Sequence, residues 1–401
     1  MKALGIVAEY NPFHNGHQYL IQMSKEKVKP DAVIAVMSGP FVQRGTPAVL
    51  DKWTRCQIAL SNGADLVCEL PVVWATANAE VFASGAVSIL NALQCSYISF
   101  GSEIGKTEPL ANIAHLLSSE PPLFKSILQT ELSHGYGFAK AREKCVARLL
   151  SPADAEILSQ PNNILGIEYL KAIDRSQFNI SPITIKRLGA AHDQKTQHSF
   201  SSSALRNLIK TNNIDLAKNY LPYSTQILKH TNIVHLERNY ENFIRAKLLT
   251  SSVKQLKTLP DVSEGLEFSI YNTKKQIPFP SYQNIINSVS SKRIPKSRIR
   301  RILFYLALNI SNSIIKECWE NEVPYIKILG MNTRGRTYLS SIKKSLQIPL
   351  LVNPKSNQVK LNMQARDILN FDVRAQNLWN FLNEDSSLFQ DYRHLPILNF
   401  K

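Results

Sequence analysis

The chain has 401 residues, with 47 Lys and Arg against 31 Asp and Glu, so its formal net charge at neutral pH is +16. This length predicts two domains, and the apolar content is sufficient for a core in each. The positive charge favours a polyanionic partner such as a nucleic acid. Because there is no run of about 18 apolar residues and no charged leader at the N-terminus, we expect a cytoplasmic protein that is not attached to a membrane.

The cysteines argue against a disulfide framework and against a zinc ribbon. They are odd in number, widely spaced and never form a Cys-x-x-Cys pair. We therefore expect buried free thiols at Cys56, Cys68, Cys95, Cys145 and Cys318.

Strand-like and helix-like segments alternate over the first hundred residues. Strands are predicted at residues 3–10, 31–39, 64–71 and 95–103, and helices at residues 16–26, 52–62 and 78–93. Continuous apolar strands separated by helices are typical of a parallel sheet that is covered on both faces. Ligands of such sheets bind beyond the carboxyl ends of the strands. A further strand is predicted at residues 180–189, before a helix within residues 199–210.

The second half of the chain has a different character. Helix-like segments dominate at residues 220–249, 285–290 and 299–320, and strands are predicted at residues 325–332 and 350–354. No internal repeat or low-complexity tract marks a boundary between the halves, and we place it after residue 205. The expected fold class is therefore α/β, with a Rossmann-like parallel-sheet domain over residues 1–205 and a mainly helical, basic domain over residues 206–401.

The sequence NPFHNGH directly follows the first predicted strand and leads into a helix. His14 and His17 are three residues apart, so they share one face of the first helical turn. That turn has unpaired backbone N–H groups and the positive end of the helix dipole, which favours an anion. Gly16 lets a nucleotide approach the backbone, and imidazoles can donate hydrogen bonds to phosphate oxygens. A zinc site fits poorly because no Cys or acidic third ligand is near, and a chance occurrence of the pattern is the other alternative.

A second motif, HSFSSSALR at residues 198–206, opens a later helix. Ser202 and Ser203 can cap this helix and offer hydroxyls to phosphates, and Arg206 follows one turn later. Alone the motif is weak, because a serine before a helix is usually only a cap.

Together the two motifs resemble the His-x-Gly-His signature and the Ser/Thr-rich helix start of the nucleotidyltransferase superfamily. A fuller set of blocks is similar, over nearly the whole chain, to the bacterial tRNA(Met) cytidine acetate ligase family; it includes GIVAEYNPFHNGH, MSGPFVQRGTPAVLDKWTR, GADLVCELP, PNNILGIEYL, SKRIPKSRIRRIL and ILGMNTRGRTYL. The resemblance implies a nucleotidyltransferase domain that activates acetate with ATP to acetyl-adenylate. It also implies transfer of the acetyl group to the exocyclic amine of the anticodon wobble cytidine in elongator tRNA(Met), which gives N4-acetylcytidine.

The resemblance implies an ATP site whose residues can be placed one by one. His14 and His17 would be the catalytic pair that contacts the phosphates. The ATP-binding residues would be Val7, Ala8, Glu9, Tyr10, Asn11, Pro12, Phe13, His14, Asn15, Gly16, His17, Gln18, Tyr19, Leu20, Gly101, Asn162 and Arg187. Asn163 is an alternative to Asn162. Apart from the resemblance, a turn role is open for Gly101 and Asn162, and a surface salt bridge is open for Arg187.

The segment QRGTPAVLDKWTR supplies secondary candidates. Arg44, Lys52 and Arg55 could close over the triphosphate, and Asp51 could orient them or help to hold a magnesium ion. A solvated loop is equally compatible with this sequence. Magnesium is expected together with ATP, but no residue is assigned as a metal ligand.

Basic clusters in the second half favour contact with RNA. The segment KRIPKSRIRR has six Lys or Arg and no acid, and NTRGR adds two more. Such clusters neutralise phosphates without reading sequence. The expected tRNA-binding residues are Lys292, Arg293, Lys296, Arg298, Arg300, Arg301, Arg334 and Arg336. A basic helix face that is merely solvated is the alternative.

Two other functions are compatible with parts of the sequence. One is a small-molecule adenylyltransferase or cytidylyltransferase of cofactor synthesis, but the second half of the chain would then have no assigned role. The other is an RNA-binding protein that keeps the nucleotide site only as a relic or sensor, and the two histidines, Gly16 and the Ser-rich helix start argue against it. The sequence does not predict an oligomeric state.

Overall fold

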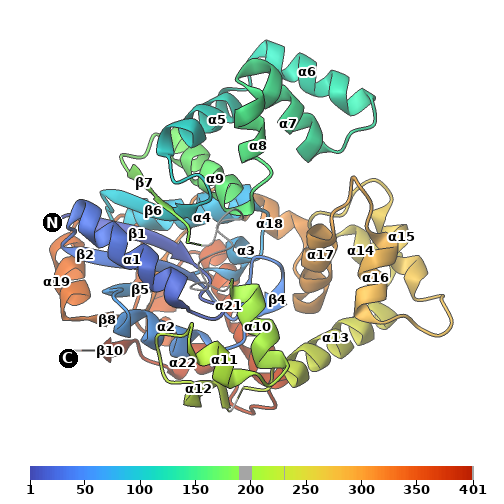
Figure 1. Ribbon diagram of the computed structural model, residues 1–401. Helices are drawn as coiled ribbons and strands as arrows, with labels where there is room; N and C mark the ends of the chain where they lie inside the picture. Colours follow the sequence, from blue (N-terminus) through green and yellow to red (C-terminus); the bar gives the residue numbers. More distant parts are fainter. Residues whose placement is uncertain (189–200, 230, 400–401) are drawn as a thin grey trace.

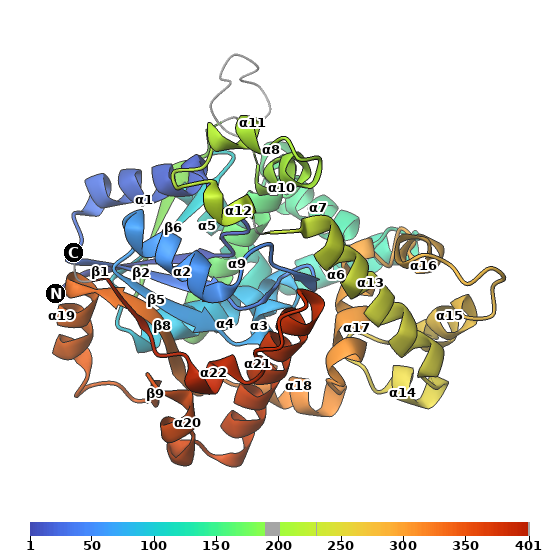
Figure 2. The same cartoon turned by 90° about the horizontal axis from the view of Figure 1, so that it is seen from below.

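The structure is a computed structural model that describes residues 1–188, 201–229 and 231–399. An eight-stranded sheet runs through its centre (Figure 1, Figure 2). The strands are β1 (Ala3–Ala8), β2 (Ala32–Ser38), β5 (Leu66–Leu70), β6 (Tyr97–Ser102), β7 (Ser181–Lys186), β8 (Ile326–Asn332), β9 (Leu350–Leu351) and β10 (Ile397–Asn399). Their order is β10–β8–β5–β2–β1–β6–β7, with β9 beside β8. A separate ribbon pairs β3 (Phe41–Val42) with β4 (Thr46–Pro47).

The sheet is parallel in the first half of the chain and mixed overall. Strands β1, β2, β5, β6 and β7 are parallel, as their apolar sequences predict. Strand β8, however, runs antiparallel to β5, and β9 and β10 are parallel to β8. The helices from α10 (Ser202–Lys210) to α18 (Asn312–Trp319) separate β8 from β7, so β8 does not follow from a simple βαβ unit of the kind that joins parallel strands. The parallel sheet predicted within residues 1–205 is confirmed, and the strands added by the second half of the chain make the complete sheet mixed.

Each face of the sheet has its own core because side chains alternate along the strands. Leu4 and Ile6 of β1 pack on the face covered by α1 (Asn15–Val28) and α2 (Lys52–Ser61). Ala3 packs on the other face, with α3 (Val72–Ala75) and α4 (Ala79–Ala92). Strand β1 lies between β2 and β6, so its carboxyl end, where the histidine turn begins, is held from both sides.

A helical lobe is inserted between β6 and β7 and stands at the top of Figure 1. It consists of α5 (Thr107–Ser119), α6 (Pro122–Ser133), α7 (Phe138–Leu149), α8 (Pro152–Ile157) and α9 (Pro161–Ser176). None of these helices is among the elements predicted above. Helix α9 packs against both α4 and α5, so it joins the lobe to the sheet.

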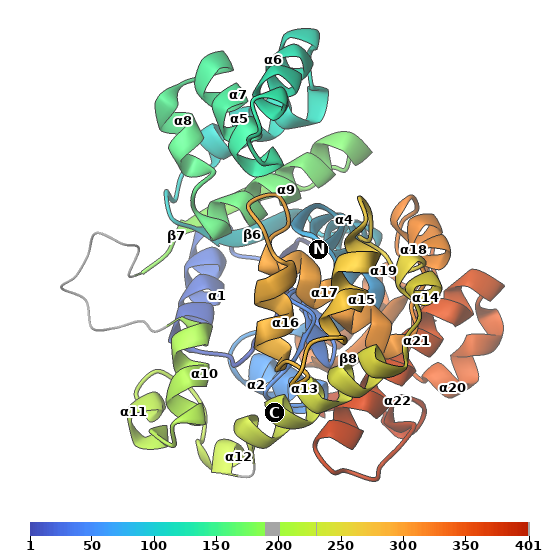
Figure 3. The ribbon, with the colours of Figure 1, turned by 90° about the vertical axis from the view of Figure 1, so that its right-hand side faces the viewer.

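The second half of the chain contributes helices and also completes the sheet (Figure 3). Its helices are α10 (Ser202–Lys210), α11 (Ile214–Lys218), α12 (Gln226–Lys229), α13 (Ile233–Thr250), α14 (Val253–Lys257), α15 (Leu266–Thr273), α16 (Tyr282–Val289), α17 (Lys296–Leu308), α18 (Asn312–Trp319), α19 (Thr333–Ile342), α20 (Pro354–Asn357), the 3-10 turn Gln358–Lys360, α21 (Met363–Leu382) and α22 (Gln390–Arg393). The helix predicted at residues 299–320 is broken at Asn309, whose φ is +53°. The domain division after residue 205 stays a prediction, and the sheet takes strands from both sides of it.

Two smaller features concern the cysteines and the membrane. All five cysteines are free and buried, as predicted.

Within the described residues, no helix combines the length and the apolarity needed to cross a bilayer.

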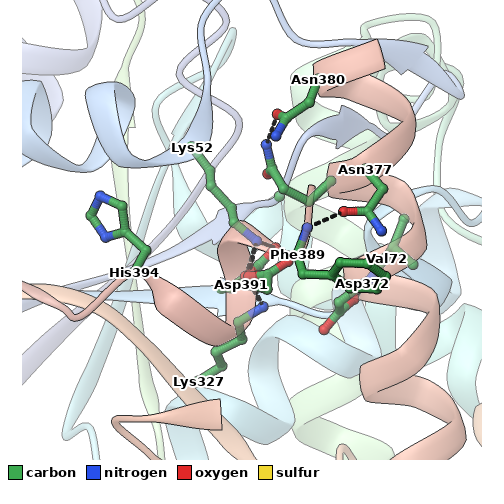
Figure 4. A network of polar contacts seen from close by, with 12 residues as sticks. Lys52, Val72, Lys327, Asp372, Asn377, Asn380, Phe389, Asp391 and His394 are labelled. Atoms are coloured by element: carbon green, nitrogen blue, oxygen red, sulfur yellow. Dashed lines mark hydrogen bonds and ion pairs between the residues drawn. The ribbon is translucent and has the colours of Figure 1, made fainter. Parts of the chain in front are cut away.

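Four buried charges, of Lys52, Glu69, Lys327 and Asp391, join the two halves of the chain. Figure 4 shows Lys52, Lys327 and Asp391. The Lys52 ammonium lies 2.9 Å from Glu69 Oε2 and 2.6 Å from Asp391 Oδ1. The Lys327 ammonium lies 2.8 Å from Glu69 Oε2 and 2.6 Å from the same Asp391 oxygen. Burial alone would raise the pKa of Asp391, but Lys327 and Lys52 outweigh it and the pKa is lowered. The four groups thus form a buried charge cluster of two cations and two anions.

A third carboxylate, Asp372 of α21, lies close to this cluster (Figure 4). It accepts hydrogen bonds from the Val72 backbone N–H at 2.7 Å and from the Tyr325 hydroxyl at 2.9 Å. Burial raises the pKa of Asp372 to about 7, and the neighbouring Lys327 acts against this rise. These bonds attach α21 to the start of α3 on the sheet.

The buried charge cluster can be tested with Lys327→Met. The substitution leaves two buried carboxylates with a single cation, so we expect the free energy of unfolding to fall by about 3–5 kcal/mol. Urea denaturation measures this change. The control is Lys316→Met on α18, where the ammonium is 3.8 Å from Glu320 and the side chain is 71% exposed. The control should change stability by less than about 1 kcal/mol, and equal losses in both variants would contradict the role assigned to the cluster.

Candidate functional site

A cavity of about 420 Å³ opens beyond the carboxyl ends of β1, β6 and β7. It is lined by the turn after β1, the ribbon β3–β4, the start of α9, the end of β7 and the start of α10. Of the predicted ATP residues, those that line it are Val7, Ala8, Glu9, Tyr10, Asn11, His14, Gly16, His17, Tyr19, Leu20, Gly101, Asn162 and Arg187. Of the secondary residues, Arg44, Ser202, Ser203 and Arg206 also line it. Segments that are far apart in the sequence therefore meet at the sheet edge where a ligand was expected.

The two histidines cap the helix that they begin. His14 is the N-cap of α1, and its Nδ1 accepts a hydrogen bond from the Gly16 N–H at 3.0 Å. The His17 Nδ1 in turn accepts a hydrogen bond from the His14 backbone N–H at 3.2 Å. This reciprocal pair is a capping box made by imidazoles. Because each Nδ1 accepts a backbone N–H, the proton of each neutral ring lies on Nε2, which leaves an Nε2–H donor for a ligand.

Both imidazoles are neutral at physiological pH. Burial and, to a smaller extent, the positive charge of Arg187 lower the pKa of His14 to about 4. Burial also places the pKa of His17 well below its ordinary value, with His14 and Arg187 acting in the same direction. The two ring centres are only 3.9 Å apart. The two neutral rings can therefore stabilise negative charge on a ligand by donating hydrogen bonds, although they carry no positive charge themselves.

Other residues of the motif support the turn and do not line the cavity. The buried ring of Phe13 packs 5.5 Å from the His17 ring. The Asn15 backbone N–H donates to the Tyr220 carbonyl at 2.9 Å, and Gln18 donates to Asn62 at 3.2 Å. Pro12 is likewise absent from the lining. Pro12, Phe13, Asn15 and Gln18 thus do not line the cavity, and the assignment of ATP contacts to residues Val7 to Leu20 stays a prediction.

The opposite wall of the cavity is a hydrogen-bonded row. The Asn162 amide donates to Glu103 Oε1 at 2.6 Å, and its oxygen accepts from Arg187 Nη1 at 3.2 Å. A Cβ on Gly101 would come within 3.2 Å of the Arg187 side chain, so the glycine leaves room for it. Asn163, in contrast, is buried and accepts from the Glu103 backbone N–H. Of the two asparagines, Asn162 is the one that faces the cavity.

The serine motif differs from its prediction in one respect. Ser201 caps α10, because its hydroxyl accepts from the Ala204 N–H at 3.2 Å. Ser202 and Ser203 therefore do not cap the helix; both line the cavity. Arg206 donates to the Asn11 carbonyl at 2.6 Å and to the Ser203 hydroxyl at 2.9 Å, so it bridges the two motifs. Residues 198–200 of the motif lie outside the described residues.

The residues at the start of α2 stabilise the structure around the cavity but do not line it. Asp51 caps α2 by accepting from the Thr54 N–H at 2.8 Å, and Lys52 belongs to the buried charge cluster. Arg55 is fully buried and donates to the backbone carbonyls of Leu50, Glu9, Ser38 and Gly39. Lys52 and Arg55 are fully buried with their charged groups already paired, so the expectation that they close over the triphosphate is corrected. Asp51, which was expected to orient them or help to hold magnesium, caps α2 and does not line the cavity. Arg44 alone of this group lines the cavity.

Several lining residues were not predicted. They include Gln43, Thr46, Phe82, Phe100, Leu165, Tyr169 and Lys186. Leu165 and Tyr169 follow Asn162 by three and seven residues, a spacing that places them on the same helix face. That spacing was visible in the sequence. Phe82, which comes from α4, carried no such signal.

The predicted RNA-binding cations fall in two places. Lys292, Arg293 and Lys296 lie in or next to the loop before α17 and are exposed. Arg298 donates to the Asp261 carbonyl, and Arg301 pairs with the Asp261 carboxylate at 3.1 Å. Arg300 donates to Gln283. Arg334 and Arg336 lie on α19, at the other end of the sheet from α17 (Figure 1).

Comparison with known proteins identifies the class of this fold and site. A sequence model of the family described as HIGH Nucleotidyl Transferase matches residues 1–393. The chain therefore belongs to the HIGH nucleotidyl transferases.

Comparison with individual proteins identifies a more specific family within this class. The tRNA(Met) cytidine acetate ligase of Clostridium perfringens is 39% identical, over 99% of this chain and 100% of its own length. That of a Thermoanaerobacter species is 41% identical over 97% of each chain. The crystal structure of Thermotoga maritima TmcAL bound with alpha-thio ATP superposes with a TM-score of 0.91 at 33% identity, with full coverage of both chains. The chain is thus a member of the tRNA(Met) cytidine acetate ligase family.

The protonation of the histidine turn can be measured by NMR. We expect nitrogen-15 shifts that show Nδ1 unprotonated in both rings at pH 6 to 7, and a pKa of His14 near 4. This folded pKa lies below the unfolded value of about 6.5. The contribution of the neutral His14 ring to the free energy of unfolding is therefore fully present above about pH 6.5 and is lost as the pH falls toward 4. His14→Asn and His17→Asn assign the two signals. A proton on Nδ1 at neutral pH would contradict the capping box.

Proposed function

We propose that this protein is an ATP-dependent ligase that acetylates the exocyclic amine of the wobble cytidine in the anticodon of elongator tRNA(Met). Acetate and ATP give acetyl-adenylate and pyrophosphate in the first step. The cytidine amine then takes the acetyl group and AMP leaves, which gives N4-acetylcytidine. The family to which the chain belongs supports this choice of substrates.

The observation that carries the proposal is the donor set at the end of β1. His14 and His17 each offer an Nε2–H, while Arg44, Arg187 and Arg206 line the same cavity. These groups suit a polyphosphate, whose negative charge they would offset. A carboxylate oxygen attacks the α-phosphorus while the bond to pyrophosphate breaks, and the attacking anion needs no general base. The neutral imidazoles then stabilise charge on the phosphate oxygens.

The second step needs no covalent enzyme intermediate. The nitrogen lone pair of the cytidine attacks the acetyl carbon, the bond between that carbon and the AMP oxygen breaks, and the amine loses a proton. No cysteine is among the described residues that line the cavity, and the Cys68 thiol is buried, which raises its pKa. Direct transfer from the mixed anhydride is therefore the path that these residues support, provided that water is kept out.

We also propose that Mg²⁺ accompanies the triphosphate. Glu9 is the single carboxylate among the described residues that line the cavity, and its Oε1 accepts from the Gln43 N–H at 2.9 Å. Within the described part of the chain, no group of three His, Cys, Asp or Glu is arranged to hold a metal ion. The donor set fits a cation that is held mainly by phosphate oxygens and water, with Glu9 as the available protein oxygen. Bound there, Mg²⁺ would neutralise charge on the leaving pyrophosphate.

The remaining assignments are part of the same proposal. Residues 1–205 would provide most of the catalytic cavity, and residues 206–401 would bring the tRNA to it. The basic residues of the second half would contact the tRNA, and the reaction would take place in the cytoplasm without membrane attachment.

Two measurements test the function. Labelled pyrophosphate should exchange into ATP only when acetate is present, and mass analysis of elongator tRNA(Met) incubated with ATP, acetate and the protein should show one acetyl group on the wobble cytidine. Exchange that ignores acetate would favour a small-molecule nucleotidyltransferase. Unmodified tRNA after complete incubation would refute the ligase assignment.

His14→Asn separates the catalytic role of the imidazole from its capping role. Asparagine is a good N-cap, so the free energy of unfolding should change by less than about 1 kcal/mol. Loss of one transition-state donor should lower the rate of acetate-dependent exchange by about 100- to 1,000-fold. The control is His115→Asn on α5, where the ring is 77% exposed and faces Asp174 at 3.7 Å. A His14→Asn rate equal to that of this control would remove His14 from the catalytic step.

A further inference from the structure

We propose that the loop joining α6 to α7 and the loop preceding α17 form one RNA-binding surface, on which the ring of Phe138 stacks against an unpaired base of the tRNA. We call this surface the Phe138 platform; it consists of Tyr136, Phe138, Lys292, Arg293 and Lys296. The inference rests on the proposed function, because it assumes that the ligand is a tRNA. It adds a tRNA contact from the inserted lobe, whereas all the tRNA-binding residues expected from the sequence lie in the second half of the chain.

The two loops touch each other although they are far apart in the sequence. A Cβ on Gly137 would lie 3.0 Å from the Lys292 carbonyl oxygen and 3.9 Å from the Arg293 Cα. A Cβ on Gly135 would lie 4.0 Å from the Arg293 guanidinium. Figure 1 and Figure 3 show the lobe standing above α16 and α17, with the loop before α17 reaching toward it. The aromatic and basic residues of these loops therefore share one stretch of surface.

The aromatic side chains of the first loop are exposed. The segment HGYGF places a glycine on each side of Tyr136 and before Phe138. Phe138 is 57% exposed and Tyr136 is 40% exposed. The Lys144 ammonium lies 4.3 Å from the centre of the Tyr136 ring and forms a cation–π contact with it. A solvent-facing ring beside positive charge is the arrangement that single-stranded RNA-binding proteins use for base stacking.

The cations of the second loop are available for phosphates. Lys292, Arg293 and Lys296 are exposed, and none of them forms an ion pair with a carboxylate of the described residues. Arg298 and Arg301, one turn further on, are instead held by the Asp261 carbonyl and carboxylate. The cations of the basic segment that have no acidic partner among the described residues are thus the ones that lie beside the exposed aromatic rings. Phosphate contacts from these cations would position the RNA while Phe138 holds a base.

The lobe couples this surface to the cavity. Arg142 of α7 pairs with Glu168 of α9 at 3.2 Å. Asn162, which lines the cavity, lies in the first turn of α9. An RNA held at the Phe138 platform would therefore be bound by the same lobe that forms one wall of the ATP site. An unpaired base of the anticodon loop fits such a platform, since the bases of a duplex are already stacked on each other.

Phe138→Ala in the full-length protein tests the platform. We expect the affinity for unmodified elongator tRNA(Met), measured by fluorescence anisotropy, to fall about 10-fold, because base stacking on one ring is lost. Phe138→Tyr keeps a ring and should restore most of the affinity. Acetate-dependent pyrophosphate exchange needs no tRNA, so it should equal that of the unmodified protein in both variants.

The matched control is Leu123→Ala, at the other end of α6. Leu123 is 61% exposed and belongs to the same lobe, but lies away from the loop. The control should bind tRNA like the unmodified protein, and Lys292→Gln with Arg293→Gln should reduce the salt dependence of binding by about two units of slope.

The possible results separate the platform from the function on which it rests. Unchanged tRNA affinity in Phe138→Ala, together with normal exchange, would overturn the platform alone. An equal loss in Leu123→Ala would also overturn it, because the effect would then come from a loosened lobe. Absence of acetate-dependent exchange in the unmodified protein would instead refute the proposed function. Phe138→Ala that binds tRNA normally but loses binding to a protein partner would assign the surface to that partner.

Discussion

The pairing of two buried lysines with two buried carboxylates is the interaction on which the arrangement of this chain depends. Its members come from the start of α2, from β5, from β8 and from α22. A charge removed from water without a partner is costly, so the four positions must come together for any one of them to be buried. The cluster thereby fixes the antiparallel strand β8 and the short helix α22 beside the segment that leads from β2 to α2. That segment also carries Arg44 into the cavity.

Burial has the opposite effect on the histidine turn, where it keeps the side chains uncharged. At the charge cluster, ionised groups are kept because each finds a counter-charge. At the turn, burial lowers the pKa of both imidazoles and the positive charge of Arg187 acts in the same direction, so both rings are kept neutral. The same fold thus buries charge in one place and excludes it in another. This contrast leaves the cavity rich in hydrogen-bond donors, while its positive charge comes from Arg44, Lys186, Arg187 and Arg206.

Local patterns in the sequence predicted the features that depend on near neighbours. The apolar runs predicted β1, β2, β5 and β6, and the spacing of His14 and His17 predicted their shared helical turn. The role of Lys52 was not predictable, because its partner Asp391 is hundreds of residues away and neither flanking sequence marks a buried ion pair. Ser201 was missed as the cap because three consecutive serines offer the same hydroxyl, and only backbone geometry selects one. The direction of β8 was also hidden, since side-chain alternation is the same in parallel and antiparallel strands.

The position of β8 has a consequence for how the chain is made. Strand β5 receives its second neighbour only from residues 326–332, and the last strand of the sheet comes from residues 397–399. On the ribosome, β1, β2, β5, β6 and β7 can assemble long before these residues emerge. Until then one side of β5 presents unpaired backbone groups, the kind of edge that invites pairing with another chain. A nascent chain that still lacks residues 326–332 can therefore form the parallel part of this sheet only with one side of β5 unpaired.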